Sequence, residues 1–179
     1  MKLLVLTHPM FNDIELTTVL GCLIRSGKMS KITLYNHKHK SATGQFGVTT
    51  LALENKVNLD EYDAIFIPGG KGAQELRKDP ESLKVIDYFI KNDKWVCAIC
   101  DAPNVLYENH FIDDKVKYSS FPIIPLVGGK NRNEKTVTVN NKIITGRCAA
   151  SSMEFGLTLV KEFFGEDVYE PIRKGMFGA

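Results

Sequence analysis

The sequence contains little that would place the protein in a membrane, in an oxidising compartment or on nucleic acid. Its apolar start, Leu3 to Leu6, is followed at once by His8, Pro9 and Asn12, so it is too short for a signal-peptide core or a membrane span. Four cysteines in 179 residues do not make a disulfide framework. The net charge of +2 at pH 7 is too small to indicate nucleic-acid binding. These absences predict a cytoplasmic protein with free thiols and no membrane or nucleic-acid partner.

Internal repeats, low-complexity tracts and linkers rich in proline, glycine or serine are also missing, so we expect residues 1–179 to form one domain. Apolar runs alternate instead with helical patterns. Strands are expected at Lys2–Thr7, Lys31–Tyr35, Ala64–Ile67 and Trp95–Ile99, and helices at Ile14–Arg25, Pro80–Lys91, Asp101–Asn109 and Ser151–Phe164. In the first helix, Ile14, Thr18 and Cys22 share one side. Residues Thr136 to Thr145 indicate a hairpin with an Asn140-Asn141 turn.

This alternation predicts an α/β fold in which helices cover both faces of a mostly parallel sheet. Such sheets bind ligands beyond the carboxyl ends of their strands, at a topological switch point. Four segments fall at that edge: His8 to Glu15, the turn at Pro68-Gly69-Gly70, the turn at Cys100, and Gly146-Arg147-Cys148. Candidate functional residues are therefore sought there.

One cysteine is distinguished by its position at the end of a predicted strand. Cys100 directly follows the strand that ends at Ile99, and Pro103 falls in the first turn of the next helix, where its missing N–H costs little. Hydrolases present their nucleophile on such a strand-to-helix elbow. The N–H groups and dipole of the helix start should lower the pKa of the thiol. A buried structural cysteine is the alternative, but the elbow favours a reactive Cys100.

The Cys97-Cys100 spacing is that of a redox CxxC motif, but its position in a strand argues against a disulfide. A rise of about 3.3 Å per residue separates the two by roughly 10 Å, whereas disulfides need Cα atoms within about 7 Å. Cys97 is therefore expected in the core. Asp101 suits a helix start, but its charge opposes a neighbouring thiolate.

Further candidates lie at the same edge of the sheet. The backbone N–H groups of Gly69 and Gly70 would suit an oxyanion pocket beside the cysteine. Glu15 is either a solvated glutamate in a first helical turn or a carboxyl beside the crevice. His8 ends the first strand and could approach the crevice, while the other three histidines are interpreted as surface residues. No set of His, Cys and Asp has metal-ligand spacing, so no metal is expected.

Several segments match a known family in its order over nearly the whole chain. These segments are Asp13-Ile14-Glu15, Ile65–Gly70, Ala98–Pro103, Ser119–Pro122, and Ile144–Arg147 followed by Ser152–Phe155. As a set they resemble the ThiJ/PfpI superfamily, also called the DJ-one family, and come closest to its bacterial ThiJ-like branch. The resemblance implies a flavodoxin-like three-layer sandwich that forms a homodimer.

The resemblance also implies roles for individual residues. Cys100 becomes a nucleophile and an oxidation-sensitive thiol, and Glu15 becomes its protonated, hydrogen-bonded partner. The backbone at Gly70 and Asp101 takes the oxyanion-binding positions. The loop with Arg147 and Cys148 matches one that lies near the reactive cysteine, so Cys148 is either a small packed residue or a resolving thiol.

Two departures from the family bear on the reaction. The PfpI peptidase branch has a histidine where this chain has Asp101, and other branches have one where this chain has Phe121. The downstream His/Glu pair of the glutaminases, among the class I glutamine amidotransferase-like relatives, is also missing. Peptidase and amidase activities are therefore disfavoured.

The resemblance implies instead a cofactor-free reaction on small reactive carbonyls, of the glyoxalase or deglycase type, in a stress response. Cys100 would add to the aldehyde while Glu15 relays protons. The alternative is a non-catalytic redox sensor or chaperone, in which an oxidant modifies Cys100.

Overall fold

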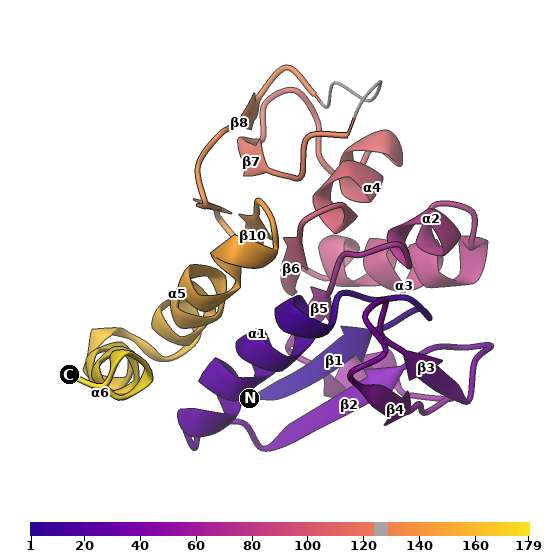
Figure 1. The fold of residues 1–179 in the computed structure, drawn as a ribbon. Helices are drawn as coiled ribbons and strands as arrows, with labels where there is room; N and C mark the ends of the chain where they lie inside the picture. Colours follow the sequence, from indigo (N-terminus) through magenta and orange to yellow (C-terminus); the bar gives the residue numbers. More distant parts are fainter. Residues whose placement is uncertain (124–128) are drawn as a thin grey trace.

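A six-stranded sheet forms the centre of the computed structural model, which describes residues 1–123 and 129–179 (Figure 1). Its strands, in spatial order, are β2 (Lys31–Tyr35), β1 (Lys2–Leu6), β5 (Ala64–Ile67), β6 (Trp95–Ile99), β10 (Ile143–Gly146) and β9 (Val137–Asn140). All neighbours are parallel except β9, which pairs antiparallel with β10. The chain order changes direction next to β1, so the carboxyl ends of β1, β5 and β6 form the expected ligand-binding edge.

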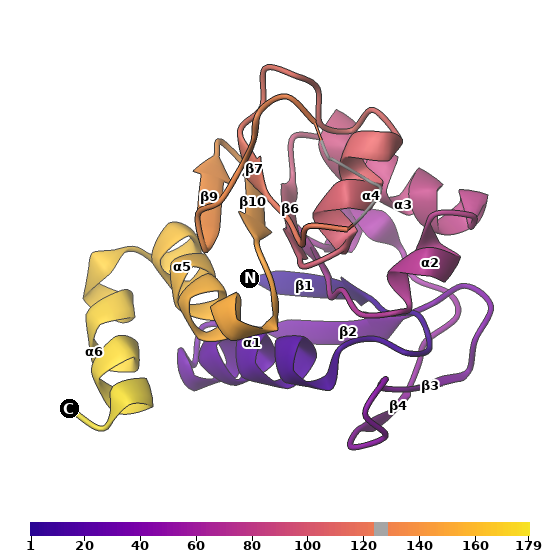
Figure 2. The same cartoon turned by 45° about the horizontal axis from the view of Figure 1, so that its top comes forward.

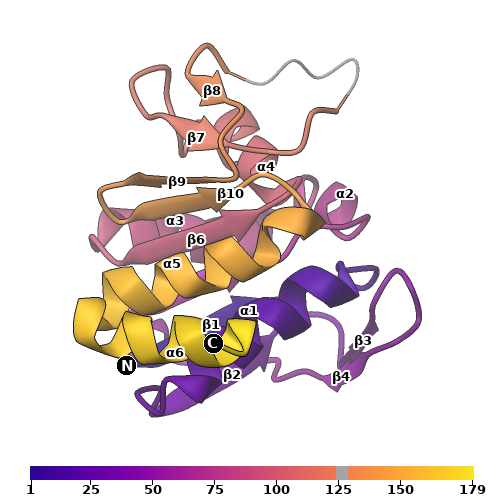
Figure 3. The ribbon, with the colours of Figure 1, turned by 60° about the vertical axis from the view of Figure 1, so that its left-hand side comes forward.

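Helices cover both faces of this sheet, as the alternating pattern predicted. On one face lie α1 (Asp13–Arg25), α5 (Ser152–Phe164) and α6 (Glu166–Phe177), and on the other lie α2 (Ala73–Leu76), α3 (Pro80–Lys91) and α4 (Ala102–Glu108). Figure 3 shows α1, α5 and α6 in front of the strands and α3 behind them. The three-layer α/β sandwich is confirmed.

Each strand buries alternate residues in two separate cores because side chains on a strand alternate between faces. Leu3, Val5 and Phe66 pack with α1 and α5, whereas Leu4 and Ile65 pack with the helices of the opposite face. This double burial explains why the strands are continuous apolar runs rather than alternating patterns. It also leaves only the ends of the strands open for a site.

Two elements differ from the sequence prediction. The two-residue turn between β9 and β10 is Asn141-Lys142, because Asn140 is still paired with Ile143 in the ladder; Asn141 takes the positive φ of 51°. On α1 the buried side includes Leu16 and Val19, whereas Ile14 is exposed. The buried side of α1 is therefore rotated by a fraction of a turn from the predicted side with Ile14, Thr18 and Cys22.

Several short elements were not predicted at all. They are β3 (Ser41–Thr43) and β4 (Thr50–Ala52), which form a hairpin, β7 (Tyr118–Ser119) and β8 (Arg132–Asn133), and the one-turn helices η1 (Leu59–Glu61) and η2 (Ala149–Ser151), besides α2 and α6. Figure 2 shows the β3–β4 hairpin projecting from the end of β2, apart from the main sheet. No helix in the described part of the chain is long and apolar enough to cross a membrane.

Candidate active site

Cys100 lies on the turn between β6 and α4, in a conformation that non-glycine residues rarely adopt. Its φ is 65°. Its backbone N–H donates to the carbonyl of Gly146 at 2.9 Å, and its carbonyl accepts from the N–H of Phe121 at 2.8 Å. Hydrogen bonds on both sides therefore hold the elbow, as is usual where strained residues serve a function.

The sulfur of Cys100 faces a cavity of about 390 Å³ at the carboxyl edge of the sheet. Glu15 from α1, Gly70 after β5, and Phe121 line it, together with Cys148, two residues after β10. The residue is only 9% exposed, so the thiol opens into the cavity and not onto the outer surface. The sequence-predicted segments at the strand ends thus meet around one space.

The Gly69-Gly70 turn brings backbone close to Cys100. A Cβ on Gly69 would lie 2.6 Å from Cβ of Cys100, so no larger residue fits there. Gly70 has a φ of +87°, and a Cβ on it would lie 2.5 Å from the N of Asn12. The backbone N–H groups of Gly70 and Asp101 both act on the sulfur of Cys100, where they lower the pKa of the thiol. These are the two predicted oxyanion donors.

Glu15 is fully buried beside Cys100, at the start of α1. Its Oε2 accepts a hydrogen bond from the N–H of Gly69 at 2.8 Å, while Oε1 has no partner among the described residues. Burial raises the pKa of Glu15 to about 7, against smaller opposing effects of Cys100 and Gly69. A protonated carboxyl turns the unpartnered oxygen into a donor, which suits an acid that faces a sulfur.

Burial is also the largest influence on Cys100, and it raises the pKa of the thiol; the charge of Glu15 raises it further. The expected lowering by the helix start is present but smaller, because the α4 N-terminus contributes through one N–H while the sulfur loses most of its water. Cys100 and Glu15 are therefore one coupled pair that holds a proton between them. Ionising both groups at once is disfavoured by their like charges.

Sequence reasoning missed Arg77, the residue that follows α2. Its guanidinium holds both carboxylate oxygens of Asp101, with Nη1–Oδ2 at 2.5 Å and Nη2–Oδ1 at 2.6 Å. Its Nε donates to Glu108 Oε2 at 2.8 Å. Gln74 and Asn104 add hydrogen bonds to the same Asp101 carboxylate. The Asp101 charge, which was expected to oppose a thiolate, is thus matched by a half-buried cation.

The β3–β4 hairpin is fixed to the start of α1 and reaches the cavity. The Asp13 carboxylate accepts hydrogen bonds from the backbone N–H groups of Phe46, Val48 and Thr49 at 2.9, 3.2 and 2.8 Å. Burial alone would raise the pKa of Asp13, but these donors bring it below its ordinary value. Gln45, in the same turn, lines the cavity.

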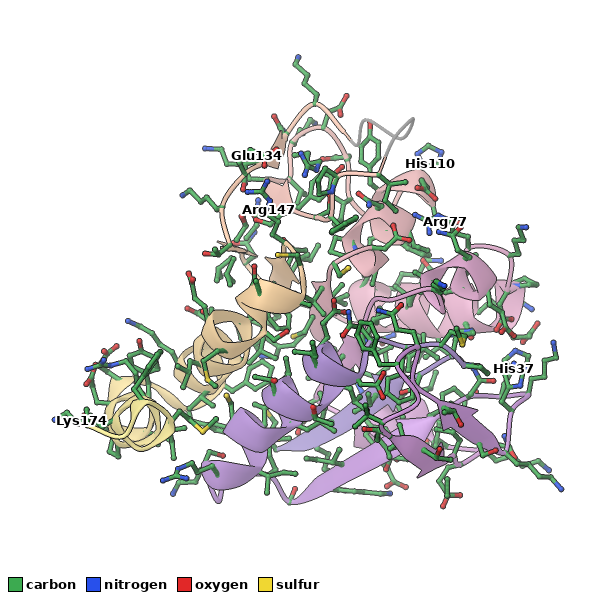
Figure 4. The ribbon with its side chains drawn as sticks, viewed as in Figure 1. His37, Arg77, His110, Glu134, Arg147 and Lys174 are labelled. Carbon is green, nitrogen blue, oxygen red and sulfur yellow. The ribbon has the colours of Figure 1, made fainter. Side chains whose placement is uncertain are left out.

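His8, which could have approached the crevice beside Cys100, does not line the cavity. Its Nε2 lies 3.1 Å from Oδ2 of Asp79 and 3.3 Å from the hydroxyl of Ser82, and the ring is buried between β1 and α3. His37 contacts the same Asp79 at 2.9 Å, so two histidines flank one carboxylate. Figure 4 shows His37 and His110 at the outer side of the molecule.

The remaining candidates divide between the cavity and the surface. Arg147 is turned outward and paired with Glu134, as Figure 4 shows at the upper left. Cys148, the next residue, is half-buried and lines the cavity. Cys97 is fully buried in β6, as predicted. No group of His, Cys, Asp or Glu side chains among the described residues is arranged to hold a metal ion.

The fold and the elbow define a class: α/β sandwich proteins that carry a cysteine on a strand-to-helix turn beside a buried acid, above the end of a parallel sheet. A comparison with models of known protein families identifies which family within that class the chain belongs to. The model of the DJ-1/PfpI family matches residues 1–162, and the chain belongs to that family. The predicted membership of the ThiJ/PfpI superfamily is confirmed.

Relatives and neighbours cover most of the chain. The uncharacterized protein MG029 of Mycoplasma genitalium is 40% identical over 181 residues, covering 99% of this chain and 97% of its own. YraA of Bacillus subtilis, provisionally named a cysteine protease, is 30% identical over 150 residues, or 82% and 88% of the two chains. A deglycase of Pyrococcus abyssi is 30% identical over 109 residues, or 59% and 64%. The solved structure of oxidized DJ-1 from Toxoplasma gondii matches with a TM-score of 0.84 at 23% identity, over 98% of this chain and 97% of its own.

Proposed function

We propose that this protein is a cofactor-free enzyme that converts small reactive carbonyls, and that it removes them under metabolic stress. The observation that carries the proposal is the buried Glu15 carboxyl, whose pKa is raised to about 7 beside the nucleophile Cys100. An acid that titrates near neutrality can both give and take a proton in one cycle. A protein of Pyrococcus abyssi that is named a deglycase, 30% identical over 109 residues, supports the same class of substrate.

The first step is addition of the Cys100 thiolate to the aldehyde carbon of a substrate such as methylglyoxal. The new C–S bond forms as the carbonyl π-electrons move to oxygen, which gives a hemithioacetal. The N–H groups of Gly70 and Asp101, which act on the sulfur in the free protein, would stabilise that developing oxyanion. Glu15 supplies the proton that makes it a hydroxyl.

The second step moves hydrogen between adjacent carbons. The Glu15 carboxylate removes the proton from the carbon that bears sulfur, and the proton returns to the neighbouring carbon. The product is a thioester of the 2-hydroxy acid, so the substrate is isomerised without a net change in oxidation state. Water then cleaves the thioester, which releases lactate and restores Cys100. Each proton transfer uses a carboxyl that is already desolvated next to the reacting atoms.

The test is turnover of methylglyoxal, followed as its loss and as formation of lactate. The native protein should produce lactate. Lactate formation by Cys100→Ser should fall to the uncatalysed background, because a serine hydroxyl does not ionise to a nucleophile as a thiol does. Cys22→Ala is the matched control, since Cys22 is buried between α1 and α5, away from the cavity. Lactate formation by Cys100→Ser at the native rate would refute the proposal.

Oxidation of Cys100 is the second candidate function, and the same geometry favours it. Oxygen atoms added to the sulfur would meet the N–H donors of Gly70 and Asp101 and the Glu15 carboxyl. Such contacts stabilise a sulfenic or sulfinic acid. In this reading the oxidised residue alters binding of a partner or a chaperone function, without turnover of a carbonyl.

A further inference from the structure

Two of the four cysteines line the same cavity, Cys100 from the elbow and Cys148 from the segment after β10. The other two, Cys22 and Cys97, are fully buried in the core. Cys148 is half-exposed, and all four thiols are free in this structure. An oxidant that reaches Cys100 through the cavity therefore acts next to a second thiol that solvent also reaches.

Strand pairing holds the two cysteines near each other. β6 and β10 are parallel neighbours with Ile99 opposite Gly146, and the N–H of Cys100 donates to the Gly146 carbonyl at 2.9 Å. Cys148 follows two residues later on extended backbone, with φ −164° and ψ 178°. Strand spacing of about 4.8 Å and a rise of about 3.3 Å per residue place the two Cα atoms on the order of 6–10 Å apart.

The turn that carries Cys148 is built so that a small movement closes this gap. A disulfide needs Cα atoms within about 7 Å, so a shift of a few ångströms at most is required. η2 begins directly after Cys148 and carries the small side chains of Ala149 and Ala150. Arg147 on the other side is paired with the exposed Glu134, not with the core. The sulfur of Cys148 contacts only the hydroxyl of Ser151, at 3.6 Å, among its hydrogen-bond partners in the described chain.

We propose that Cys148 is the resolving thiol of Cys100, so that this site reduces small hydroperoxides through an internal disulfide. The inference rests on the nucleophilic Cys100 of the proposed function, but not on turnover of carbonyls. The cavity gives a small hydroperoxide access to Cys100, and Cys148 lines the same space.

The chemistry balances with two co-reactants. The Cys100 thiolate attacks the terminal oxygen of the hydroperoxide, the O–O bond breaks, sulfur is oxidised to a sulfenic acid, and the departing alkoxide takes the proton of Glu15. The Cys148 thiol then attacks the Cys100 sulfur. The S–O bond breaks as the S–S bond forms, and the hydroxyl leaves as water with the thiol proton. An external dithiol reduces the disulfide and is itself oxidised.

The experiment is peptide mapping after oxidation. Reduced protein is treated with stoichiometric hydrogen peroxide, free thiols are blocked with N-ethylmaleimide, and non-reducing digests are examined by mass spectrometry. The native protein should give a peptide pair linked through Cys100 and Cys148. In Cys148→Ser, dimedone should instead label the sulfenic acid of Cys100, and without dimedone the sulfinic acid of Cys100 should accumulate. Cys22→Ala should form the same disulfide as the native protein.

A second measurement follows peroxide consumption with dithiothreitol as reductant. Cys148→Ser should be at least about tenfold slower over many turnovers, because an unresolved sulfenic acid is lost to overoxidation. Equal sulfinic acid in the native protein and in Cys148→Ser, with Cys148 still alkylated, would overturn the inference. So would a disulfide that joins two copies through Cys148, seen as a dimer on a non-reducing gel. Absence of lactate formation from methylglyoxal would refute only the carbonyl proposal.

Discussion

At the scale of single residues, Glu15 determines in which pH range the site can act. An isolated glutamate is ionised near neutrality, but burial raises the pKa of Glu15 to about 7. The carboxyl therefore keeps its proton throughout the acidic range and loses it as the pH rises through 7. Loss of that first proton leaves the Cys100–Glu15 pair with one proton, and this state includes the Cys100 thiolate beside a protonated Glu15.

We expect kcat/KM for methylglyoxal to increase as the pH rises through an apparent pKa near 7, because the pair then passes from two protons to the one-proton state that contains the reactive thiolate. The measurement is a pH profile of initial rates. Glu15→Gln keeps the size of the side chain and a hydrogen-bond donor but cannot relay a proton, so its turnover should be about 10²–10⁴-fold slower. It should still permit alkylation of Cys100 by iodoacetamide. A Gln variant with native turnover, or with the same acidic limb, would contradict this role.

The residues that sequence could and could not predict differ in a physical way. Cys100 and the Gly69-Gly70 turn were visible because their roles follow from local backbone: a strand end, a positive φ and a close approach. The direction of the Cys100 pKa shift was not visible in the sequence, because it depends on how much water folding removes from around the sulfur. His8 was misplaced for a similar reason, since its partner Asp79 is 71 residues away.

At the scale of elements, Arg77 connects α2 to both ends of α4. It pairs with Asp101 at the start of α4 and with Glu108 at its end. The helix that positions the Asp101 N–H at the nucleophile is thus fixed by an ion-pair network. No sequence pattern indicated it, because charged partners 24 and 31 residues away carry no periodic signal.

We expect Arg77→Met to lower the free energy of unfolding by about 3 kcal/mol, because it leaves the Asp101 carboxylate buried without its cation. Asp101→Asn added to that variant should recover most of the loss, since only the half-buried Glu108 then lacks its cation. Urea unfolding of the two single variants and the double variant measures the coupling. Additive losses in the double variant would show that the pair does not stabilise the elbow.

Element boundaries also show how far pattern reading extends. β2, β5, β6 and α3 were predicted at their observed bounds, because apolar runs and a Pro80 start are strong local signals. α6 was missed because no residue in it is fully buried and Pro171 lies inside it. The turn after β9 was misplaced by one residue, since Asn140 and Asn141 are equally suited to a turn and only the ladder register separates them.

At the scale of the whole molecule, exposed apolar side chains gather where α1 meets the β3–β4 hairpin. Ile14, Phe46 and Val48 are all exposed, Val48 to 80%, and the Asp13 hydrogen bonds hold the hairpin turn beside the helix start. Gln45 in the same turn lines the cavity, so this surface borders the site. An apolar patch of this kind on a protein expected to form a homodimer is the surface most suited to a second copy.

We expect the protein to be a dimer in solution. The double variant Phe46→Ser with Val48→Ser should raise the dissociation constant of that dimer by at least about tenfold. Size-exclusion chromatography with light scattering at several concentrations measures the shift. Phe177→Ser is the matched control, because Phe177 is equally exposed but lies at the end of α6, far from the hairpin in sequence and in Figure 1. Dissociation by Phe177→Ser but not by the hairpin variant would place the interface on the opposite side.

The distribution of histidines over the molecule leads to the last prediction, that the protein does not cleave peptides or hydrolyse glutamine. Amide hydrolysis needs a group that protonates the departing amine, usually a histidine that also activates the nucleophile. All four histidines lie within the described residues, and none lines the cavity around Cys100. His8 is held by Asp79, and Phe121, which lines the cavity, offers no group that can transfer a proton.

Carbonyl addition is less affected by this lack, because an aldehyde carbon has no amine to expel and Glu15 suffices as the acid. Casein, fluorogenic peptides and glutamine should therefore remain intact under conditions in which methylglyoxal is consumed, despite the provisional name of the relative YraA. The native protein and Cys100→Ser are compared in each assay. Cleavage at an enzymatic rate that disappears in Cys100→Ser would show that Glu15 alone can protonate a departing amine, and that the missing histidine does not limit the reaction.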